Sequence, residues 1–451
     1  MNRTLPLILT AALLLTACAS AVPAQPADAT TSPSAAASSP ALPDAAASSP
    51  SQPAAETSAP PLTPKFPVGH LLTLPQNQNS GPVWNTGDAL YELRDASNMT
   101  PEALVLKTDY AALTQSVYCD IPGCTHDSDA CPAYLASDFC VGVMAVDGTV
   151  YTYPGELTNV APTQIYRIDP AAGKTPVAAV PDALPHHMQL QWCDEYALYG
   201  CPLAASHQPG TLYRWDWRND TVQTIPMLAD EKIIACEGSR FLTIRIEANE
   251  PFPNFGSTEQ EKAILAHAVY VYAWLDPATG AREKICTRPY ADGYFHNYYD
   301  GRIYYTGNFR NADTPGQQAA LLYFDTADGT EKTLLETIPF DTYGIDVCEP
   351  FSPAFAGVPQ RYLRVLNAGD AYADCLLDME TGDVLPAPAV TAEGVRRPAL
   401  LLACTASGQW LTTANPRDSY DPQYSRYALW DPADFLADGQ PAAWVTMYAT
   451  E

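Results

Sequence analysis

Basic residues are scarce in this sequence. Lys and Arg together number 24 in 451 residues, against 51 Asp and Glu, and the formal net charge is −27 at pH 7. A nucleic-acid-binding protein needs a basic surface that displaces counterions from phosphates. Electrostatic attachment to anionic lipid headgroups needs basic clusters as well. The composition therefore predicts no nucleic-acid partner and no charge-driven contact with a membrane.

Signatures of the common catalytic sites are also missing. The chain has no Gly-x-Ser-x-Gly turn, no phosphate-binding glycine loop, no His-Glu-x-x-His helix and no Cys-x-x-Cys pair. The 7 histidines are scattered, apart from the adjacent pair His186-His187. Carboxylates are so numerous that no pair of them stands out for acid–base chemistry. We predict no catalytic residue, and a non-enzymatic protein is favoured.

Long apolar runs are limited to the amino end. Residues 1–18 contain Arg3 and an apolar stretch, Leu5–Leu15, that is too short to span a bilayer comfortably. The stretch ends in Leu15-Thr16-Ala17-Cys18, which resembles the lipobox of bacterial lipoproteins. That resemblance implies a signal peptide over residues 1–18 and a diacylglycerol anchor on Cys18. Two acyl chains bury enough methylene groups for stable attachment.

The next segment, residues 19–65, lacks apolar periodicity. It is almost wholly Ala, Pro, Ser and Thr, and its only acidic residues are Asp28, Asp44 and Glu56. A segment of this composition cannot bury enough apolar surface to offset the entropy of ordering, so we predict a disordered linker. The 47% apolar and 10% aromatic content of the whole chain is ample for a core, so the folded domain is predicted over residues 66–451.

A repeat runs through this remainder. Each unit has a strand, a turn that usually contains Gly, a second strand, a loop, a third strand that ends at an Asp, and a fourth strand. The strand-end carboxylates are expected to accept backbone N–H groups of the following turn and so to be structural. They are Asp109, Asp169, Asp216, Asp276, Asp325, Asp378 and Asp431. Four short antiparallel strands per unit predict an all-β fold, a β-propeller of seven four-stranded blades, with six or eight possible. One helical insertion is expected at Ser257–Ala268.

With this repeat, residues 80–450 resemble the secreted, lipid-anchored β-propellers of anaerobic Gram-positive bacteria. That family has no established function and is related in shape to the propeller modules of lipoprotein receptors. The resemblance implies a surface lipoprotein on the extracytoplasmic face of the cell membrane, held there by its lipid anchor.

The most distinctive segment is rich in cysteine, and its Cys, Pro, Cys-x-His, Cys-Pro-Ala pattern is shared with that family. It contains Cys119, Cys124, His126 and Cys131, followed by Cys140. Disulfides among these cysteines are the favoured interpretation, because stapled loops are common outside the cytoplasm. A structural zinc on Cys119, Cys124, His126 and Cys131 is the second interpretation, although the spacings differ from common zinc motifs. Free thiols are the third. No other cofactor is predicted.

Four further cysteines, Cys193, Cys236, Cys348 and Cys404, fall at one position of the repeat, near the end of the first strand. We expect them to pack as small apolar residues.

Two functions remain open for a propeller of this kind. The favoured one is a binding or scaffolding platform for a protein, peptide or glycan of the cell envelope. The alternative is an extracellular carbohydrate-active hydrolase or lyase with carboxylates around the central channel. A weaker third possibility is a metal or redox sensor that uses the cysteine-rich loop. Most aromatic residues are expected to pack between blades.

Overall fold

The protein was analysed as a computed structural model of the whole chain. The structure describes residues 63–74, 83–95, 102–136, 141–157, 163–202, 207–252, 258–292, 295–307, 320–337, 348–350, 361–365, 375–386, 389–392, 394–414 and 425–448. The signal segment, Cys18 and nearly all of the linker lie outside these residues. Residues 61–451 form one compact unit.

The described residues form seven antiparallel sheets that each contain four strands in chain order, as one sequence repeat predicts. We number these sheets 1 to 7 from the amino end. Sheet 1 holds β2 (Val83–Asn85), β3 (Ala89–Asp95), β4 (Ala103–Asp109) and β5 (Thr114–Val117). Sheet 2 holds β7 (Val141–Val146), β8 (Thr149–Pro154), β10 (Gln164–Asp169) and β11 (Gly173–Ala179). Sheet 3 holds β12 (Met188–Cys193), β13 (Leu198–Pro202), β14 (Pro209–Asp216) and β15 (Thr221–Ala229). Sheet 4 holds β16 (Glu231–Glu237), β17 (Arg240–Glu247), β18 (Val269–Leu275) and β19 (Arg282–Pro289).

The carboxyl-terminal half continues the same plan. Sheet 5 holds β20 (Phe295–Tyr299), β21 (Arg302–Gly307), β22 (Ala320–Asp325) and β23 (Thr330–Leu335). Sheet 6 holds β24 (Cys348–Pro350), β25 (Tyr362–Val365), β26 (Cys375–Asp378) and β27 (Val384–Pro386). Sheet 7 holds β30 (Leu400–Cys404), β31 (Trp410–Ala414), β32 (Arg426–Trp430) and β33 (Ala443–Trp444). The predicted strand–turn–strand order is therefore correct, and the sheet number lies within the predicted range of six to eight.

Smaller elements decorate these sheets. The predicted helical insertion is α1 (Thr258–Leu265), between β17 and β18. Sequence reasoning missed the hairpin of β28 (Ala389–Ala392) and β29 (Val395–Pro398), and the short helix α3 (Pro432–Leu436). The remaining elements are β1 (Leu72–Thr73), β6 (Tyr134–Leu135), β9 (Glu156–Leu157) and the 3₁₀ turn η1 (Tyr290–Asp292). No helix among the described residues is long and apolar enough to span a membrane.

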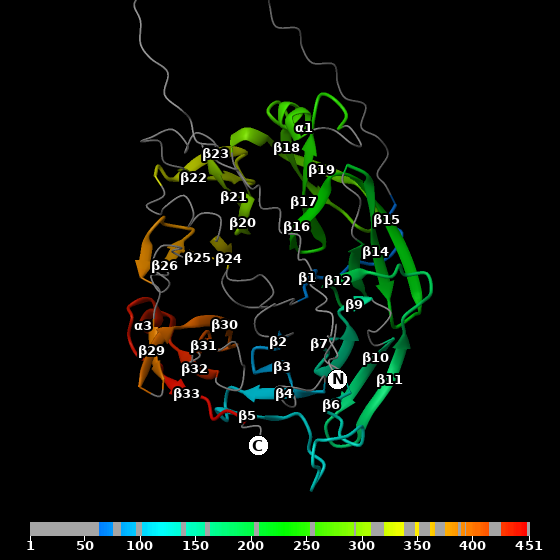
Figure 1. Cartoon of the computed structure of the whole chain (residues 1–451), viewed down its shortest axis with the longest axis vertical. Coiled ribbons are helices and arrows are strands. Elements are labelled where there is room, and N and C mark those ends of the chain that lie inside the picture. Colours follow the sequence, from blue (N-terminus) through cyan, green and yellow to red (C-terminus); the bar gives the residue numbers. More distant parts are fainter. Residues whose placement is uncertain are drawn as a thin grey trace, which may run out of the picture. The chain divides into compact units, whose positions relative to one another are not determined.

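The sheets follow one another around a closed ring, which makes the fold a β-propeller (Figure 1). Residues from neighbouring sheets meet at each joint, and many of them are aromatic, as expected. These contacts are β2 and β3 on β7, Tyr151 on Trp217, Trp192 on Phe241, Trp274 on Tyr298, Tyr304 on Met379, Tyr362 on Trp410, and Tyr427 on Glu92. The last pair closes the ring between sheet 7 and sheet 1.

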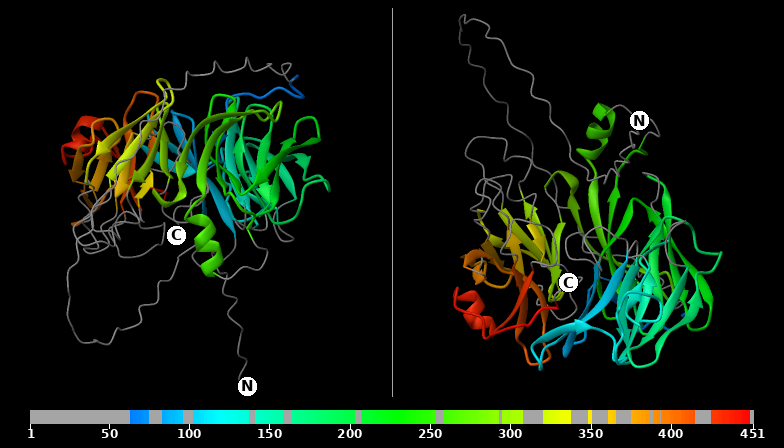
Figure 2. Two further views of the ribbon diagram at one scale, coloured as in Figure 1. Left: turned by 90° about the horizontal axis from the view of Figure 1, so that it is seen from above. Right: turned by 60° about the horizontal axis from the view of Figure 1, so that its bottom comes forward.

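The two ends of every sheet differ. Because the four strands alternate in direction, the turns after the first and third strands lie at one end, which we call the turn face. Residues 65–74 cross this face: the Lys65 amide donates to Ala278 O, and β1 pairs with β12. The long connections and α1 lie at the other end, which we call the loop face. The left panel of Figure 2 shows the green α1 and the blue segment that carries β1 on opposite sides of the ring.

Candidate functional site

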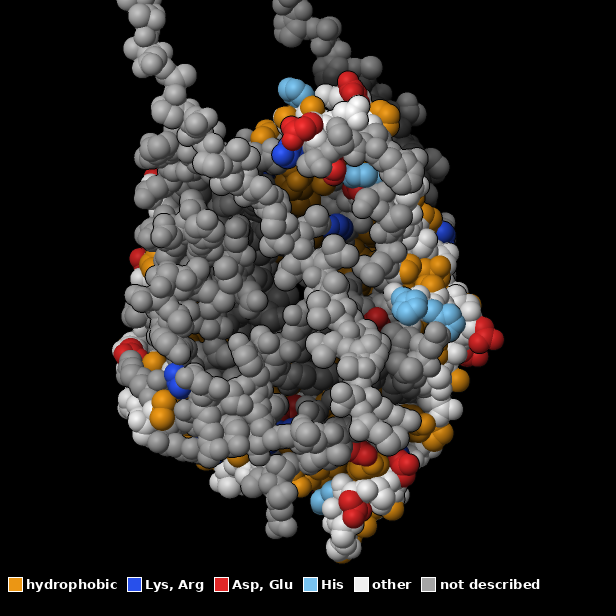
Figure 3. All heavy atoms as spheres, in the orientation of Figure 1, with side chains coloured by type: hydrophobic (Ala, Val, Ile, Leu, Met, Phe, Trp, Pro, Cys, Tyr) orange, Lys and Arg blue, Asp and Glu red, His pale blue; other side chains and the backbone are white. Residues whose placement is uncertain are grey.

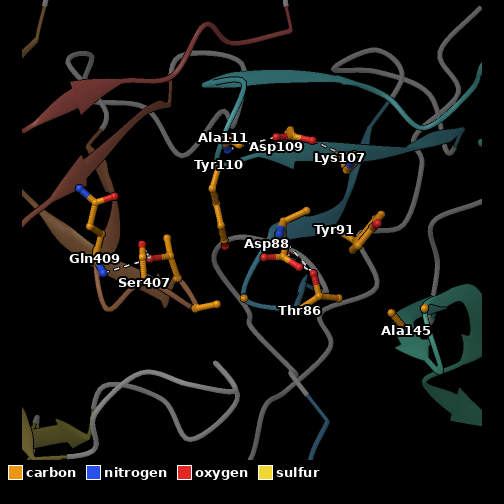
Figure 4. Close-up of a pocket in the computed structure, with 15 residues that line it drawn as sticks. Thr86, Asp88, Tyr91, Lys107, Asp109, Tyr110, Ala111, Ala145, Ser407 and Gln409 are labelled. Carbon is orange, nitrogen blue, oxygen red and sulfur yellow. Dashed lines mark hydrogen bonds and ion pairs between the residues drawn. The ribbon is translucent and has the colours of Figure 1, made fainter.

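A cavity of about 840 Å³ opens on the turn face between sheets 7, 1 and 2. Its walls are short turns: the β2–β3 turn, the end of β4, the β7–β8 turn and the β30–β31 turn (Figure 4). The lining residues are Thr86, Gly87, Asp88, Ala89, Tyr91, Lys107, Asp109, Tyr110, Ala111, Ala145, Gly148, Thr405, Ala406, Ser407 and Gln409. Three repeats therefore build one concave site, which is the usual form of a ligand pocket.

Hydrogen bonds hold these walls in place. The Asn85 side-chain Nδ2 donates to Cys404 O at 2.7 Å, and the Tyr110 hydroxyl donates to Asn85 Oδ1 at 2.9 Å. The Ala406 amide donates to Gly87 O at 2.8 Å, which ties the turn of sheet 7 to that of sheet 1. Gly87 has φ +85°, a left-handed conformation that favours glycine in this turn. The cavity is thus rigid on the side where the ring closes.

Three charged side chains line the cavity, and two of them, Lys107 and Asp109, form an ion pair. Lys107 Nζ lies 2.9 Å from Asp109 Oδ2. The pKa of Asp109 is lowered, first by the N–H of Ala112 and then by Lys107, and the pKa of Lys107 is raised by the hydrogen bond to Asp109. Both groups stay ionised as a pair. The third charged residue is the exposed Asp88, and the hydroxyls of Thr86 and Ser407 add neutral donors and acceptors to the cavity.

The described carboxyl groups whose pKa shifts are resolved all shift downward. Burial is the largest single influence on Glu231 and Asp378 and raises the pKa of both. Several contacts together outweigh it, chiefly Arg282 and the Leu228 N–H at Glu231, and Arg361 and the Glu380 N–H at Asp378. The pKa values of Asp325 and Asp328 are lowered chiefly by hydrogen bonds from Lys332. A carboxyl group that acts as a general acid near neutral pH needs a raised pKa. The pKa values of these four carboxyl groups are shifted in the opposite direction.

Six of the strand-end aspartates accept a backbone N–H of the turn that follows. The donors are Ala111 and Ala112 for Asp109, Ala171 for Asp169, Asn219 for Asp216, Ala278 for Asp276, Ala327 for Asp325, and Glu380 for Asp378. Asp431 differs, because it precedes α3 as N-cap without a side-chain capping bond. The carboxylate of Asp109 also lines the cavity, so one structural residue reaches the candidate site.

The cysteine-rich loop forms a second candidate site. It follows β5 and projects outward in cyan from the rim in Figure 1. Ligand atoms of Cys119, Cys124, His126 and Cys131 all lie within 4.8 Å of one another. His126 Nδ1 is 3.3 Å from Cys131 Sγ. Cys131 is buried, and the other three side chains are half-buried. The structure thus brings together the four residues that sequence reasoning grouped as zinc ligands.

Backbone groups face each sulfur of this cluster. The N–H groups of Ile121, His126 and Ala133 approach the sulfurs of Cys119, Cys124 and Cys131, in each case from two residues further along. The His126 contact is the main cause of a lowered pKa at the Cys124 thiol. Burial dominates at Cys119, whose pKa is raised, and at Cys131, whose pKa is raised to about 12.

Disulfides, the favoured interpretation of this segment, are not present among the described cysteines. Cys119, Cys124 and Cys131 are free thiols, and Cys140 lies outside the described residues. The physical reason is that three sulfurs and an imidazole converge on one point, instead of two sulfurs meeting as a pair.

The repeat-register cysteines behave as small buried residues where they are described. Cys193 is buried, and Cys236 and Cys404 are half-buried. Burial raises the pKa of Cys236 to about 11 and also raises that of Cys404. The side chain of Cys348 lies outside the described residues.

Comparisons with known proteins add little beyond the fold. No protein-family model and no curated protein matches the chain. It is similar to the β-propeller domain of the Trilobed protease from Pyrococcus furiosus, at 9% identity and a TM-score of 0.41, over 80% of this chain and 96% of that one. It is also similar to puromycin hydrolase, at 12% identity and a TM-score of 0.41, over 82% of this chain and about half (54%) of that one. TolB from Acinetobacter baumannii is 12% identical with a TM-score of 0.32, over 76% of each chain. These scores lie under 0.5, so the β-propeller assignment rests on the sheets and joints described above.

Proposed function

We propose that this protein is a lipid-anchored platform on the extracytoplasmic face of the cell membrane. Its propeller binds a protein, peptide or glycan of the cell envelope in the turn-face cavity. The observation that carries this proposal is the cavity itself, where turns of three sheets supply hydroxyl, amide and tyrosine groups around a neutralised Lys107–Asp109 pair. Such a lining suits an uncharged polar segment, such as sugar hydroxyls or a peptide backbone.

The acidic composition supports a ligand without negative charge. Figure 3 shows the loop face, where the acidic side chains among the coloured atoms lie in small separate groups. A net charge of −27 keeps the protein soluble and repels anionic polymers. The ligand is therefore expected to be selected by shape and hydrogen bonding, with weak dependence on salt.

The hydrolase or lyase alternative receives less support. It requires a carboxyl group held protonated near neutral pH within a pocket. Asp109, which lines the cavity, has a lowered pKa and is ion-paired with Lys107. A carboxylate in this state stabilises its turn and orients a lysine.

Binding is best tested on a defined panel of neutral wall oligosaccharides and short uncharged peptides, with the full chain as the receptor. Asp88→Arg places a long side chain at the mouth of the cavity, and Asp182→Arg makes the same charge change on an exposed residue of the β11–β12 connection, at the loop face. We expect Asp88→Arg to weaken binding by more than about tenfold, and Asp182→Arg to leave it unchanged. Equal affinities in the two variants would place the ligand elsewhere.

The anchor has a separate test. Cys18→Ser removes the thiol that would carry diacylglycerol, so the chain should move from the membrane fraction to the soluble fraction and lose incorporated fatty acid. An unchanged membrane fraction in this variant would contradict lipid anchoring without affecting the cavity proposal.

A further inference from the structure

The cysteine-rich loop has the geometry of a metal site. In a tetrahedral zinc site, Zn–S bonds of about 2.3 Å and Zn–N bonds of about 2.0 Å place neighbouring ligand atoms about 3.5–3.8 Å apart. The four ligand atoms of the loop already lie within 4.8 Å of one another, and His126 Nδ1 is 3.3 Å from Cys131 Sγ. Small side-chain rotations are enough to bring them to bonding positions around one ion.

The backbone of the loop approaches its three sulfurs in the same way. Each sulfur is approached by the N–H two residues further along the chain. His126 has φ 59°, a left-handed conformation in which Asn, Asp and His are enriched among non-glycine residues. Its Nδ1 lies 3.3 Å from Cys131 Sγ.

The donor set indicates which metal fits. Three thiolates and one imidazole select a soft or borderline ion with tetrahedral preference, and Zn²⁺ is the common one. Four protein ligands leave no open position for a water or substrate, so the site has the composition of a structural centre.

The loop is also placed where a structural ion would matter. The Asp120 amide donates to Pro170 O at 2.8 Å, so the loop contacts the β10–β11 turn of sheet 2. Lys174 of β11 forms an ion pair of 2.7 Å with Asp129 and also donates to Tyr134 O. The loop therefore lies against both sheet 1, from which it extends, and sheet 2.

We propose that Cys119, Cys124, His126 and Cys131 bind one Zn²⁺ and that this ion holds the loop as a clasp between sheets 1 and 2 at the rim of the propeller. This proposal goes beyond the platform function and stands independently of it.

The test measures metal content and coordination in the full chain purified under mild reduction. We expect about one equivalent of zinc per chain, and after exchange with Co²⁺ a thiolate-to-cobalt charge-transfer absorption with the visible bands of a tetrahedral ion. Cys124→Ser and His126→Ala, both half-buried positions, should weaken zinc affinity by more than about tenfold. Cys286→Ser, which changes a half-buried thiol on β19 outside the cluster, should keep the zinc.

Three outcomes would overturn the proposal. The first is a reduced, folded wild-type chain that binds no Zn²⁺ at micromolar free metal. The second is equal zinc affinity in Cys124→Ser and Cys286→Ser. The third is a mass-spectrometric disulfide between two of the cluster cysteines in protein purified without reductant and with zinc present. The proposal would be supported if the cluster thiols resist alkylation in the purified protein and become reactive when a chelator, without added reductant, removes the metal.

Discussion

Two joints of this ring are built in different ways. The closing joint, between sheet 7 and sheet 1, contains a buried polar network: the Tyr427 hydroxyl donates to Glu92 Oε2 at 2.6 Å, and Arg94 Nη2 lies 2.8 Å from Glu92 Oε1. Gln115 donates to the same carboxylate. The joint between sheets 1 and 2 has an apolar core that includes Val105, Leu106, Val143 and Met144, and Cys131 of the cysteine-rich loop belongs to the same core.

The difference follows from chain connectivity. Sheets 1 and 2 follow one another in the chain and are linked by residues 118–140, so chain connectivity helps to bring their apolar interface together. Sheets 7 and 1 lie at opposite ends of the folded chain; their joint also has an apolar core, which includes Val83 and Leu401, and the polar network is added to it. Glu92 and Arg94 are buried charges, which are stable only when every partner is in place. Correct closure brings the Tyr427 hydroxyl to Glu92 and the Tyr448 carbonyl to Arg94 Nη1, and a shifted closure would remove both partners.

The largest expected effect comes from breaking the closing network. Glu92→Leu leaves the Arg94 cation buried without its carboxylate, and we expect a loss of about 3–5 kcal/mol in the free energy of unfolding. Equilibrium denaturation of the full chain measures this. The matched double variant Glu92→Leu/Arg94→Leu removes both charges and should recover most of the loss. A single variant within about 1 kcal/mol of wild type would show that the network does not control closure.

The next effect concerns the clasp at the joint of sheets 1 and 2. Chelation should lower the free energy of unfolding by about 2.7 kcal/mol relative to protein held at free zinc 100-fold above its Kd. Hydrogen exchange should rise in β5, β6 and the loop, and remain unchanged in β31 and β32 of sheet 7. If exchange rises equally around the ring, or nowhere, the loop is not a local clasp.

A third joint, between sheets 3 and 4, contains an ion pair whose contribution to stability depends on pH. Glu231 of sheet 4 pairs with Arg282 at 2.6 Å, and Arg282 also donates to Pro226 O of sheet 3. The folded-state pKa of Glu231 is lowered, so its stabilisation is present above the unfolded value of about 4.3 and is lost as pH falls through the lower folded value.

Unfolding monitored between pH 6 and pH 2 tests this. Wild type should lose stability from this group as the pH falls below the unfolded value of about 4.3, and Glu231→Gln should flatten that part of the profile. A profile identical to wild type in Glu231→Gln would exclude this pair as a source of acid sensitivity.

The smallest effect distinguishes two strand-end aspartates. Asp276 accepts the N–H of Ala278 and the hydroxyl of Thr279, so Asp276→Ala should lower the free energy of unfolding by about 1 kcal/mol. Asp431 has no side-chain capping bond, and Asp431→Ala should cost less than about 0.5 kcal/mol. Thermal denaturation of both variants is the measurement. A larger loss at Asp431 would reverse the structural ranking.

Much of this architecture was predictable because the repeat is punctuated by the same residues. Strand-end aspartates and Gly turns such as Asp147-Gly148 and Asp300-Gly301 recur where the sheets turn. The hairpin β28–β29 and helix α3 were not predictable, since they interrupt the repeat without a periodic signal of their own. The path of residues 65–74 across the turn face depends on long-range contacts with sheets 3 and 4.

The candidate sites were predictable to different degrees. The four cluster residues are close in sequence, so their grouping could be expected, but the N–H contacts to sulfur and the left-handed His126 appear only in the folded loop. The turn-face cavity joins residues as distant as Thr86 and Gln409. One signal could have indicated it: turns after first and third strands must share a face, and three of them are rich in small polar residues.

X-ray absorption at the zinc edge of the full chain tests the clasp most directly. We expect three sulfur neighbours at about 2.3 Å and one nitrogen at about 2.0 Å, with the sulfur signal reduced in Cys124→Ser and unchanged in Cys286→Ser. Zinc coordinated only by oxygen and nitrogen, or the same spectrum in both variants, would contradict it.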